Sequence, residues 1–410
     1  MNNDNETNWN DRDKITRRGL LATGAALGVA GLLPVAAQQR QPARGEILAY
    51  IGTYTPNGEG IYLCSMNPAS GTLTLLNTFK DIENPSWLAL DPSRRYLYAL
   101  SEVDNFGGGK NGSVSAYAIN RTNGDLTRLN VVSSQGSTPA HLSVHPSGKY
   151  VLVANYFGGS VAVLPLQANG ALGEASDVHV DSGPRNPARA ADDPAGNFAP
   201  SDHSGPRVHM VEADPSARFV IANDAGLDQS LIWTLDLQSG KLTPAQTPSV
   251  AAPPGSAPRH FVFHPNGRLF YNLHEQDSML AAYDYNPATG GMALKQTISV
   301  LPRGFAGSNL ASELAISRDG RFLYAGNRLH DTIAIIAVRE GGRIEWVGEE
   351  WVRADYPRSF ALDPTGEWMF SCNQKGDSIT SFRIDRRSGA LRFTGHFFPV
   401  GSPANITFLT

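Results

Sequence analysis

The sequence is poor in cysteine: among 410 residues only Cys64 and Cys372 occur, and neither has a neighbour at metal-ligand spacing. This excludes a zinc site built on cysteine pairs, and no metal is expected. Each cysteine lies in a strand-like apolar run, where a thiol fills space as a small hydrophobe. The sequence leaves a disulfide between them open, because a disulfide requires two Cα atoms within bonding range.

Runs of positive charge are missing from the body of the chain, and the net charge is −4. Nucleic acid is therefore not expected as a partner. The sequence also lacks a CxxCH haem motif, a glycine-rich phosphate loop, an HExxH zinc motif and a G-x-S-x-G nucleophile elbow. We expect no cofactor, and no hydrolase chemistry that depends on a serine elbow.

The apolar stretch from Gly19 to about Leu33 is about 15 residues long, which is too short to span a bilayer comfortably. It follows the pair Arg17-Arg18 and ends near Val35-Ala36-Ala37, small residues where a signal peptidase can cut. A polar head precedes it, so the pattern favours a twin-arginine export signal over residues 1–37 rather than a core helix. No cysteine follows the stretch, so we expect no stable membrane anchor. The mature chain is expected in the periplasm or outside the cell.

Turn-forming residues are abundant, with 41 glycines and 27 prolines, and they mark an internal repeat. Each repeat has an apolar run, a turn of the type His/Asp-Pro-x-Gly, a second strand and a third, alternating strand; in most repeats a fourth strand follows. The steps are about 50 residues, with one of about 69, and the turns begin at Asp91, His145, Asp214, His264, Ser317 and Asp363. Four strands in about 50 residues predict a propeller blade.

The two ends of the chain supply complementary parts of one more blade. "ILAYIGTY", "GIYLCSMN" and "GTLTLLNTF" resemble second, third and fourth strands, and the closing "PANITFLT" resembles a first strand. Joining them closes the ring and removes exposed sheet edges. A β-solenoid or a pair of sandwiches can use similar repeats, but these half-blades favour an all-β, seven-bladed β-propeller over residues 46–410. A closed ring has no obligatory dimer edge, so we expect a monomer.

The longest repeat contains an insertion, residues 181–206, which is rich in Pro, Ala, Asp and Gly and shows no periodicity. A long segment without regular structure in a compact domain is usually functional or disordered. We therefore expect residues 181–206 to form a partly mobile lid or rim.

Ionisable residues recur at one level of the repeats when the turns are placed in register. The fourth residue before each turn is Trp87, His141, Met210, His260, Glu313 and Ser359, with Asn405 in the closing strand, and the position before it holds His209, Arg259 and Arg358. Six charged or titratable groups at one end of a channel are costly to desolvate, which predicts a site. The alternative is a wet channel whose lining only satisfies the backbone.

Two histidines are expected to have a structural role. His145 and His264 occupy turn positions where other repeats have aspartate, so they should form hydrogen bonds within the turn. Glu102 and Glu275 stand where second strands end, and turn capping is the simplest interpretation of both. Other repeats have an asparagine at this place: Asn155, Asn223, Asn327 and Asn373.

Several segments resemble the seven-bladed lactonase family, which includes propeller-type 6-phosphogluconolactonases and carboxymuconate-lactonizing cyclases. They include "YIGTYTPNGEGIY", "PAHLSVHPSGKYVLVANYFGGSVAVLPL", "PRHFVFHPNGRLFYNLHE" and "PRSFALDPTGEWMFSCNQKGDSITSFRID", and the similarity runs from about Leu48 to Leu409. The resemblance implies site residues at His141, His209, Arg259, His260 and Glu275. Two positions depart from the family pattern: His274 replaces an asparagine before Glu275, and Arg207 replaces the first of two histidines in "PRVHMV".

The resemblance implies hydrolysis of a lactone, with a small-molecule lactone as the partner. Lactone hydrolysis needs a base for water, a positive group for the oxyanion and an acid for the leaving alkoxide. A histidine suits the first and third tasks, and the guanidinium fork of arginine suits a carboxylate or an oxyanion. We therefore expect acid–base catalysis by His141 or His260 and recognition of the carbonyl or carboxylate by Arg259.

Glu275 or Glu313 is then expected to orient these groups, with His209, Glu313 and Arg358 in contact with the substrate. Export favours an unphosphorylated sugar lactone, although a 6-phosphogluconolactonase is what the family resemblance favours. Two alternatives remain from the sequence: a non-catalytic propeller that binds an anionic ligand or partner, and a muconate-type cyclase that uses the same cations on a dicarboxylate.

Overall fold

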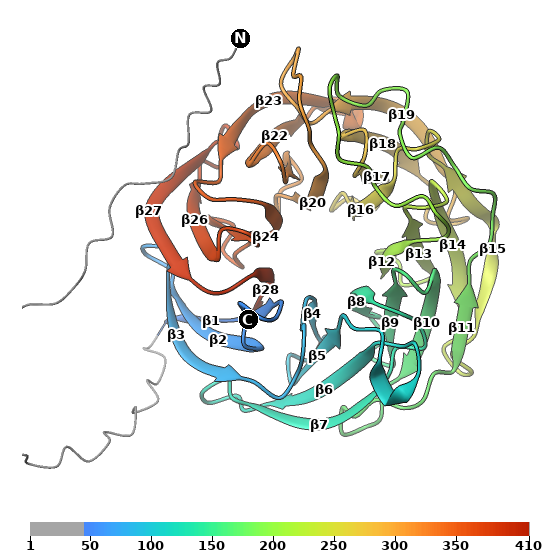
Figure 1. Ribbon diagram of the computed structural model, residues 1–410, viewed down its shortest axis with the longest axis vertical. Helices are drawn as coiled ribbons and strands as arrows, with labels where there is room; N and C mark the ends of the chain where they lie inside the picture. The colour runs from blue at the N-terminus through green and yellow to red at the C-terminus, as the bar shows by residue number, and fades with distance from the viewer. Residues whose placement is uncertain (1–44, 410) are drawn as a thin grey trace, which may run out of the picture. The chain divides into compact units, whose positions relative to one another are not determined.

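Seven four-stranded antiparallel sheets are arranged around one axis in the computed structural model, which describes residues 45–409 (Figure 1). The predicted seven-bladed β-propeller is confirmed. The export signal predicted for residues 1–37 lies outside the described residues. Within residues 45–409 the structure has no helix with the length and apolarity required to cross a bilayer.

Blade 1 joins the two ends of the chain. Its strands, from the axis outward, are β28 (Pro403–Leu409), β1 (Ile47–Thr53), β2 (Ile61–Asn67) and β3 (Thr72–Phe79). Ile51 of β1 pairs with Ile406 of β28, and Figure 1 shows the blue and red strands side by side. The prediction that half-blades from both ends close the ring is therefore confirmed.

The other blades follow in chain order, each with its first strand innermost. Blade 2 contains β4 (Leu88–Leu90), β5 (Tyr96–Ser101), β6 (Ser113–Ile119) and β7 (Leu126–Ser133). Blade 3 contains β8 (Pro139–Val144), β9 (Tyr150–Asn155), β10 (Ser160–Pro165) and β11 (Asp177–Val180). Blade 4 contains β12 (Val208–Ala213), β13 (Phe219–Asp224), β14 (Gln229–Leu235) and β15 (Leu242–Ala251).

Three more blades complete the ring. Blade 5 contains β16 (Pro258–Phe263), β17 (Leu269–His274), β18 (Met279–Tyr285) and β19 (Met292–Ser299). Blade 6 contains β20 (Ala311–Ile316), β21 (Phe322–Asn327), β22 (Thr332–Val338) and β23 (Ile344–Trp351). Blade 7 contains β24 (Pro357–Leu362), β25 (Trp368–Asn373), β26 (Ser378–Ile384) and β27 (Leu391–Pro399). Two short 3₁₀ turns, η1 (Phe106–Gly108) and η2 (Glu340–Gly342), lie in connections.

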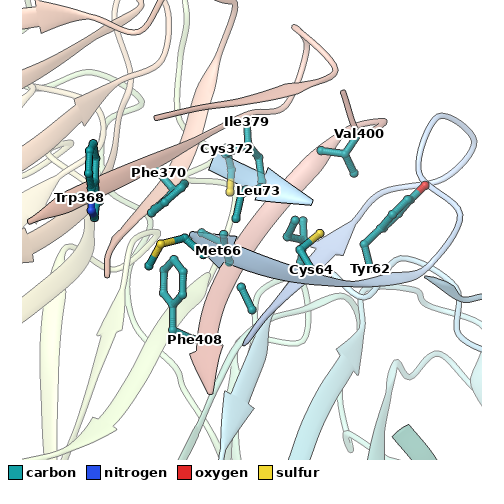
Figure 2. Packing of buried hydrophobic residues seen from close by; sticks show 13 residues of the cluster. Tyr62, Cys64, Met66, Leu73, Trp368, Phe370, Cys372, Ile379, Val400 and Phe408 are labelled. Atoms are coloured by element: carbon teal, nitrogen blue, oxygen red, sulfur yellow. The ribbon is translucent and has the colours of Figure 1, made fainter. Parts of the chain in front are cut away.

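Apolar side chains gather between the blades. Each of seven buried clusters in residues 45–409 draws its members from two neighbouring sheets. Figure 2 shows the cluster between blades 7 and 1, where Trp368 and Phe370 meet Met66 and Phe408. Each fully buried Leu, Ile or Phe contributes about 1.5–3 kcal/mol, so these interfaces fix the blades rigidly enough to position a site.

Both cysteines belong to this same cluster. Cys64 and Cys372 are free and fully buried, and burial raises the pKa of each thiol, that of Cys372 to about 12. Their role as small apolar side chains is confirmed, and the disulfide that the sequence left open is not formed in this structure.

The repeated turn is held by its first residue. Oδ1 of Asp91 accepts the backbone N–H groups of Arg95 and Tyr96, and Oδ2 accepts that of Ser93. In the same place Nδ1 of His264 accepts the N–H of Asn266 at 3.1 Å. This confirms that His264 is a turn residue, as a ring nitrogen can replace a carboxylate oxygen there.

Candidate active site

The inner strands begin, and the second strands end, at one face of the ring, because the two strands of each pair are antiparallel. We call this the site face. Side chains from the start of an inner strand therefore lie next to those that follow the end of a second strand. Both sets contribute to the candidate site.

Three histidines from three blades pack together at the site face. The ring centroids of His209 and His260 are 5.0 Å apart, and those of His141 and His260 are 5.8 Å apart. Trp87 closes the group at 4.6 Å from His141 and 5.4 Å from His260. The registered positions predicted from the sequence thus converge, although successive members are more than 50 residues apart in the chain.

The histidines are buried and neutral at physiological pH. Burial is the main cause that holds the pKa of each ring well below its usual range. Arg259 adds to this effect on His141, His209 and His260, because a nearby positive charge disfavours protonation. A neutral imidazole in this position can accept a proton, as a general base must.

His260 has one ring nitrogen held and one free. Nδ1 lies 2.8 Å from Oε1 of Glu313, whereas Nε2 has no partner among the described residues. Burial raises the pKa of Glu313 to about 8 against the opposing effect of Arg259. When Glu313 is ionised, Nδ1–H donates to the carboxylate and leaves a lone pair on Nε2. His260 is therefore the best placed base of the three.

His141 is oriented differently. Its Nδ1 accepts the backbone N–H of Val211 at 3.4 Å, so the neutral ring carries its proton on Nε2. In this tautomer His141 can donate a hydrogen bond through Nε2 to an oxygen atom that carries negative charge. His209 Nδ1 is buried without a partner among residues 45–409.

Arginines from blades 5, 6 and 7 form the second part of the site. Arg259 and Arg328 are buried, and both approach one carboxylate oxygen, Oε2 of Glu275, at 3.1 Å from Nε and 2.6 Å from Nη2 respectively. Arg358 lies over the ring of Tyr54 at 5.1 Å and 3.8 Å from Glu102. Burial lowers the pKa of Arg259 to about 9, and the positive charge of Arg328 adds to this effect.

Glu275 supports the arginines, not a histidine. Burial alone would raise its pKa, but Arg328 and Arg259 hold it at about 2. Of the two glutamates expected to orient catalytic groups, Glu313 contacts the histidine and Glu275 contacts the guanidinium groups. The three guanidinium groups contact two carboxylates, Glu275 and Glu102, so the site retains positive charge that an anion would neutralise as long as Glu313 is protonated, below its pKa of about 8.

One part of the sequence interpretation was wrong by one position. β5 and β17 end at Ser101 and His274, so Glu102 and Glu275 follow the position that asparagine takes in Asn155, Asn327 and Asn373. Glu102 accepts hydrogen bonds from Tyr54 and Ser86 across the site face instead of only capping a turn.

The sequence reasoning missed Arg328, which follows the end of β21 as Glu275 follows the end of β17. It also missed the three tyrosines at the site face: Tyr54, Tyr156 and Tyr356. Arg328, Tyr54 and Tyr156 share one position, the one directly after the end of a second strand. A comparison of that position across the repeats aligns Tyr54, Glu102, Tyr156, Glu275 and Arg328.

Arg207, where the sequence departs from the family pattern, does not join the arginine group. Its Nε donates to Asp202 at 2.8 Å and its Nη2 to Ser204 at 2.6 Å, and it lies over the ring of Phe157. Its donors are therefore used within the connection before β12. Residues 45–409 contain no group of three or more His, Cys, Asp or Glu side chains arranged to hold a metal ion.

Neutral histidines and buried arginines thus lie together at one face of a closed propeller, an arrangement that can accept protons and bind negative charge. The chain belongs to the seven-bladed β-propeller lactonase family, whose sequence profile matches residues 48–408. It is thus a lactonase by class, and the resemblance found in the sequence is confirmed.

Relatives with assigned names agree with this membership. The 6-phosphogluconolactonase of Bacillus subtilis (strain 168) is 31% identical over 88% of this chain and 98% of its own length. The 6-phosphogluconolactonase of Formosa agariphila is 27% identical over 84% of this chain and 94% of its own. Among solved structures, the periplasmic gluconolactonase of Pseudomonas aeruginosa is 29% identical, with a TM-score of 0.80, and covers 89% of this chain and 99% of its own.

Proposed function

We propose that this chain hydrolyses a sugar lactone with an anionic group, 6-phosphogluconolactone, to the open hydroxy acid. The observation that carries the proposal is the crowding of Arg259, Arg328 and Arg358 around only two carboxylates, next to a histidine with a free nitrogen. Buried positive charge of this kind is relieved by a phosphate or a developing carboxylate. The relatives named 6-phosphogluconolactonase support the same substrate.

The chemistry uses residues already in contact. His260 Nε2 takes a proton from water as the water oxygen attacks the lactone carbonyl carbon. Arg259 stabilises the negative charge on the carbonyl oxygen as the tetrahedral intermediate forms, while Arg328 binds the anionic group of the substrate. Its collapse breaks the ring C–O bond, and the proton held on His260 Nε2 passes to the alkoxide that leaves, while His141 Nε2–H donates a hydrogen bond to that oxygen. The carboxylic acid that forms loses its proton to solvent, and the guanidinium groups hold the carboxylate until it departs.

Individual roles follow from these contacts. His141 and His260 are catalytic residues, and Glu313 is a positioning residue because it acts through His260. His209 and Arg358 bind substrate at the edges of the site. Glu275 holds Arg259 and Arg328 in place, so its effect on the reaction passes through them.

An unphosphorylated sugar lactone is the second candidate. The structural neighbour from Pseudomonas aeruginosa is a periplasmic gluconolactonase, and Arg17-Arg18 with the apolar stretch after them supports twin-arginine export here. In that compartment the arginines would bind the new carboxylate alone. Replacing Arg17-Arg18 by Lys-Lys and locating the protein by cell fractionation tests the export signal: retention in the cytoplasm is expected.

The purified chain should be assayed by proton release on 6-phosphogluconolactone, glucono-1,5-lactone and a muconolactone. Faster opening of the phosphorylated sugar lactone supports the proposal, and preference for glucono-1,5-lactone supports the second candidate. Turnover of the muconolactone alone would favour a cyclase-type enzyme. No acceleration over spontaneous opening of any lactone would indicate an anion-binding propeller without catalysis.

A further inference from the structure

Residues 181–206, the insertion between β11 and β12, contact blades 5 and 6 at the site face. Ala195 forms a bridge with Ala306, and Gly307 N–H donates to Ala195 at 2.8 Å. Asn197 Nδ2 donates to the carbonyl of Asn309 at 3.2 Å. In Figure 1 the green segment after β11 runs toward β17 and β18. The insertion thus reaches a neighbouring part of the ring that is distant in sequence.

Ser201 is the point where the insertion touches the candidate site. Its side chain is buried, and Oγ donates to Oε1 of Glu275 at 2.8 Å. The other oxygen of Glu275, Oε2, receives Arg259 and Arg328. The two oxygens of this carboxylate are therefore divided between the insertion and the guanidinium groups.

The insertion is held here by further bonds that do not involve the Ser201 hydroxyl. The backbone N–H of Ser201 donates to Oε1 of Gln276, and Gln276 Nε2 donates to Asp193 at 2.9 Å and to the carbonyl of Ala199 at 3.2 Å. His203 Nε2 lies 3.2 Å from Asp228. Attachment of the segment therefore does not depend on Ser201 Oγ, which leaves this hydroxyl for orienting Glu275.

We propose that Ser201 is a positioning residue that fixes the Glu275 carboxylate, so that Arg259 and Arg328 stand ready for the anionic part of the substrate. This inference rests on the proposed function and adds a role for the insertion in recognition. A carboxylate that lacks the bond from Ser201 can rotate and take both oxygens to the arginines, which would compete with a substrate anion for the same guanidinium donors.

The test compares Ser201→Ala with Ser182→Ala, a matched change in the same insertion. Ser182 is exposed, and within residues 45–409 its side chain has no hydrogen-bond partner. Binding of 6-phosphogluconate is measured by calorimetry, and kcat and KM are measured on the lactone that the unchanged chain turns over. Thermal unfolding of each variant shows that the fold is kept.

Ser201→Ala should weaken 6-phosphogluconate binding and raise KM by about 10-fold, the effect of one hydrogen bond to a charged group, while kcat changes less than about 3-fold. Ser182→Ala should match the unchanged chain. In the Glu275→Gln background, Ser201→Ala should add less than about 2-fold, since both changes act through one carboxylate.

Equal binding by Ser201→Ala and Ser182→Ala would overturn the inference, as would full additivity with Glu275→Gln. These outcomes are distinct from failure of the proposed function, in which the unchanged chain itself opens no lactone. If the unchanged chain opens no lactone, the affinities for 6-phosphogluconate of the unchanged chain and of Ser201→Ala, measured by calorimetry, still test the role of Ser201 in anion binding.

Discussion

Nδ1 of His260 lies 2.8 Å from Oε1 of Glu313, and this pair joins the inner strands of blades 5 and 6. Glu313 Oε1 also accepts its neighbour's backbone N–H, from Leu314, at 3.0 Å. The carboxylate is therefore fixed in place, and His260 is fixed by it. The opposite ring nitrogen, Nε2, has no partner within residues 45–409, so it can accept a proton at the site face.

The protonation of this pair predicts an alkaline rise in activity. The pKa of Glu313 is raised to about 8, so below that pH the carboxyl holds its proton and donates it to Nδ1, which places the ring proton on Nε2. Above it, Nδ1–H faces a carboxylate and Nε2 is free to act as a base. We expect kcat/KM, corrected for spontaneous opening, to rise through about pH 8.

Glu313→Gln should remove this step and lower kcat by about 10- to 100-fold, since an amide cannot titrate and orients His260 less strongly. The pH profile of the variant from pH 6 to 9 is the measurement. If the step near pH 8 persists in Glu313→Gln, another group controls the base.

Arg328 is expected to control recognition of the anionic group. Arg328→Gln removes a charge that contacts Glu275 at 2.6 Å and should raise KM by about 10- to 100-fold with a smaller fall in kcat. Arg339→Gln is the matched control, because Arg339 forms an exposed pair with Glu345. Steady-state kinetics on the preferred lactone distinguish the two, and an unchanged KM in Arg328→Gln would remove Arg328 from the recognition site.

Asp181 predicts an effect of pH on stability. The Asp181 side chain is buried, Nε2 of His179 lies 3.7 Å from its Oδ1, and burial and the neighbouring Asp224 raise its pKa to about 9. A carboxyl with a raised pKa in the folded state stabilises fully below its unfolded pKa, near 4, and this contribution is lost as the pH rises toward 9.

Asp181→Asn should therefore increase the free energy of unfolding by about 1–3 kcal/mol at pH 8.5 and change it little at pH 4. Asp192→Asn, at an exposed position of the same insertion, should have no such effect at either pH. Thermal or denaturant unfolding at the two pH values checks this. An Asp181→Asn gain that is the same at pH 4 and 8.5 would mean that ionisation of Asp181 is not the cause.

Repetition made most of the fold predictable. A strand pattern with a fixed turn identifies the blades, because each copy needs the same backbone hydrogen bonds. Asp91 and His264 each begin such a turn. The complementary chain ends then predicted the closing pair of β1 and β28. The histidine cluster could be predicted for the same reason, since two adjacent register positions of the inner strands supply side chains to one region.

Other parts of the site depend on tertiary contacts that no repeat encodes. Arg328 follows the end of β21, and its role appears only when Glu275 of the preceding blade lies beside it. The assignment of Glu313 to His260 and of Glu275 to the arginines needed the side-chain geometry. The insertion has no periodicity, so its bond from Ser201 to Glu275 had no signal in the sequence.

The most direct test compares acid release from 6-phosphogluconolactone by the unchanged chain and by His260→Asn at pH 8. His260→Asn keeps a polar side chain but loses the Nε2 base, so kcat should fall by about 100- to 10,000-fold while product binding stays within a few-fold. Equal rates in the two proteins, both above spontaneous opening, would contradict the assignment of the base to His260 and of catalysis to this face of the ring.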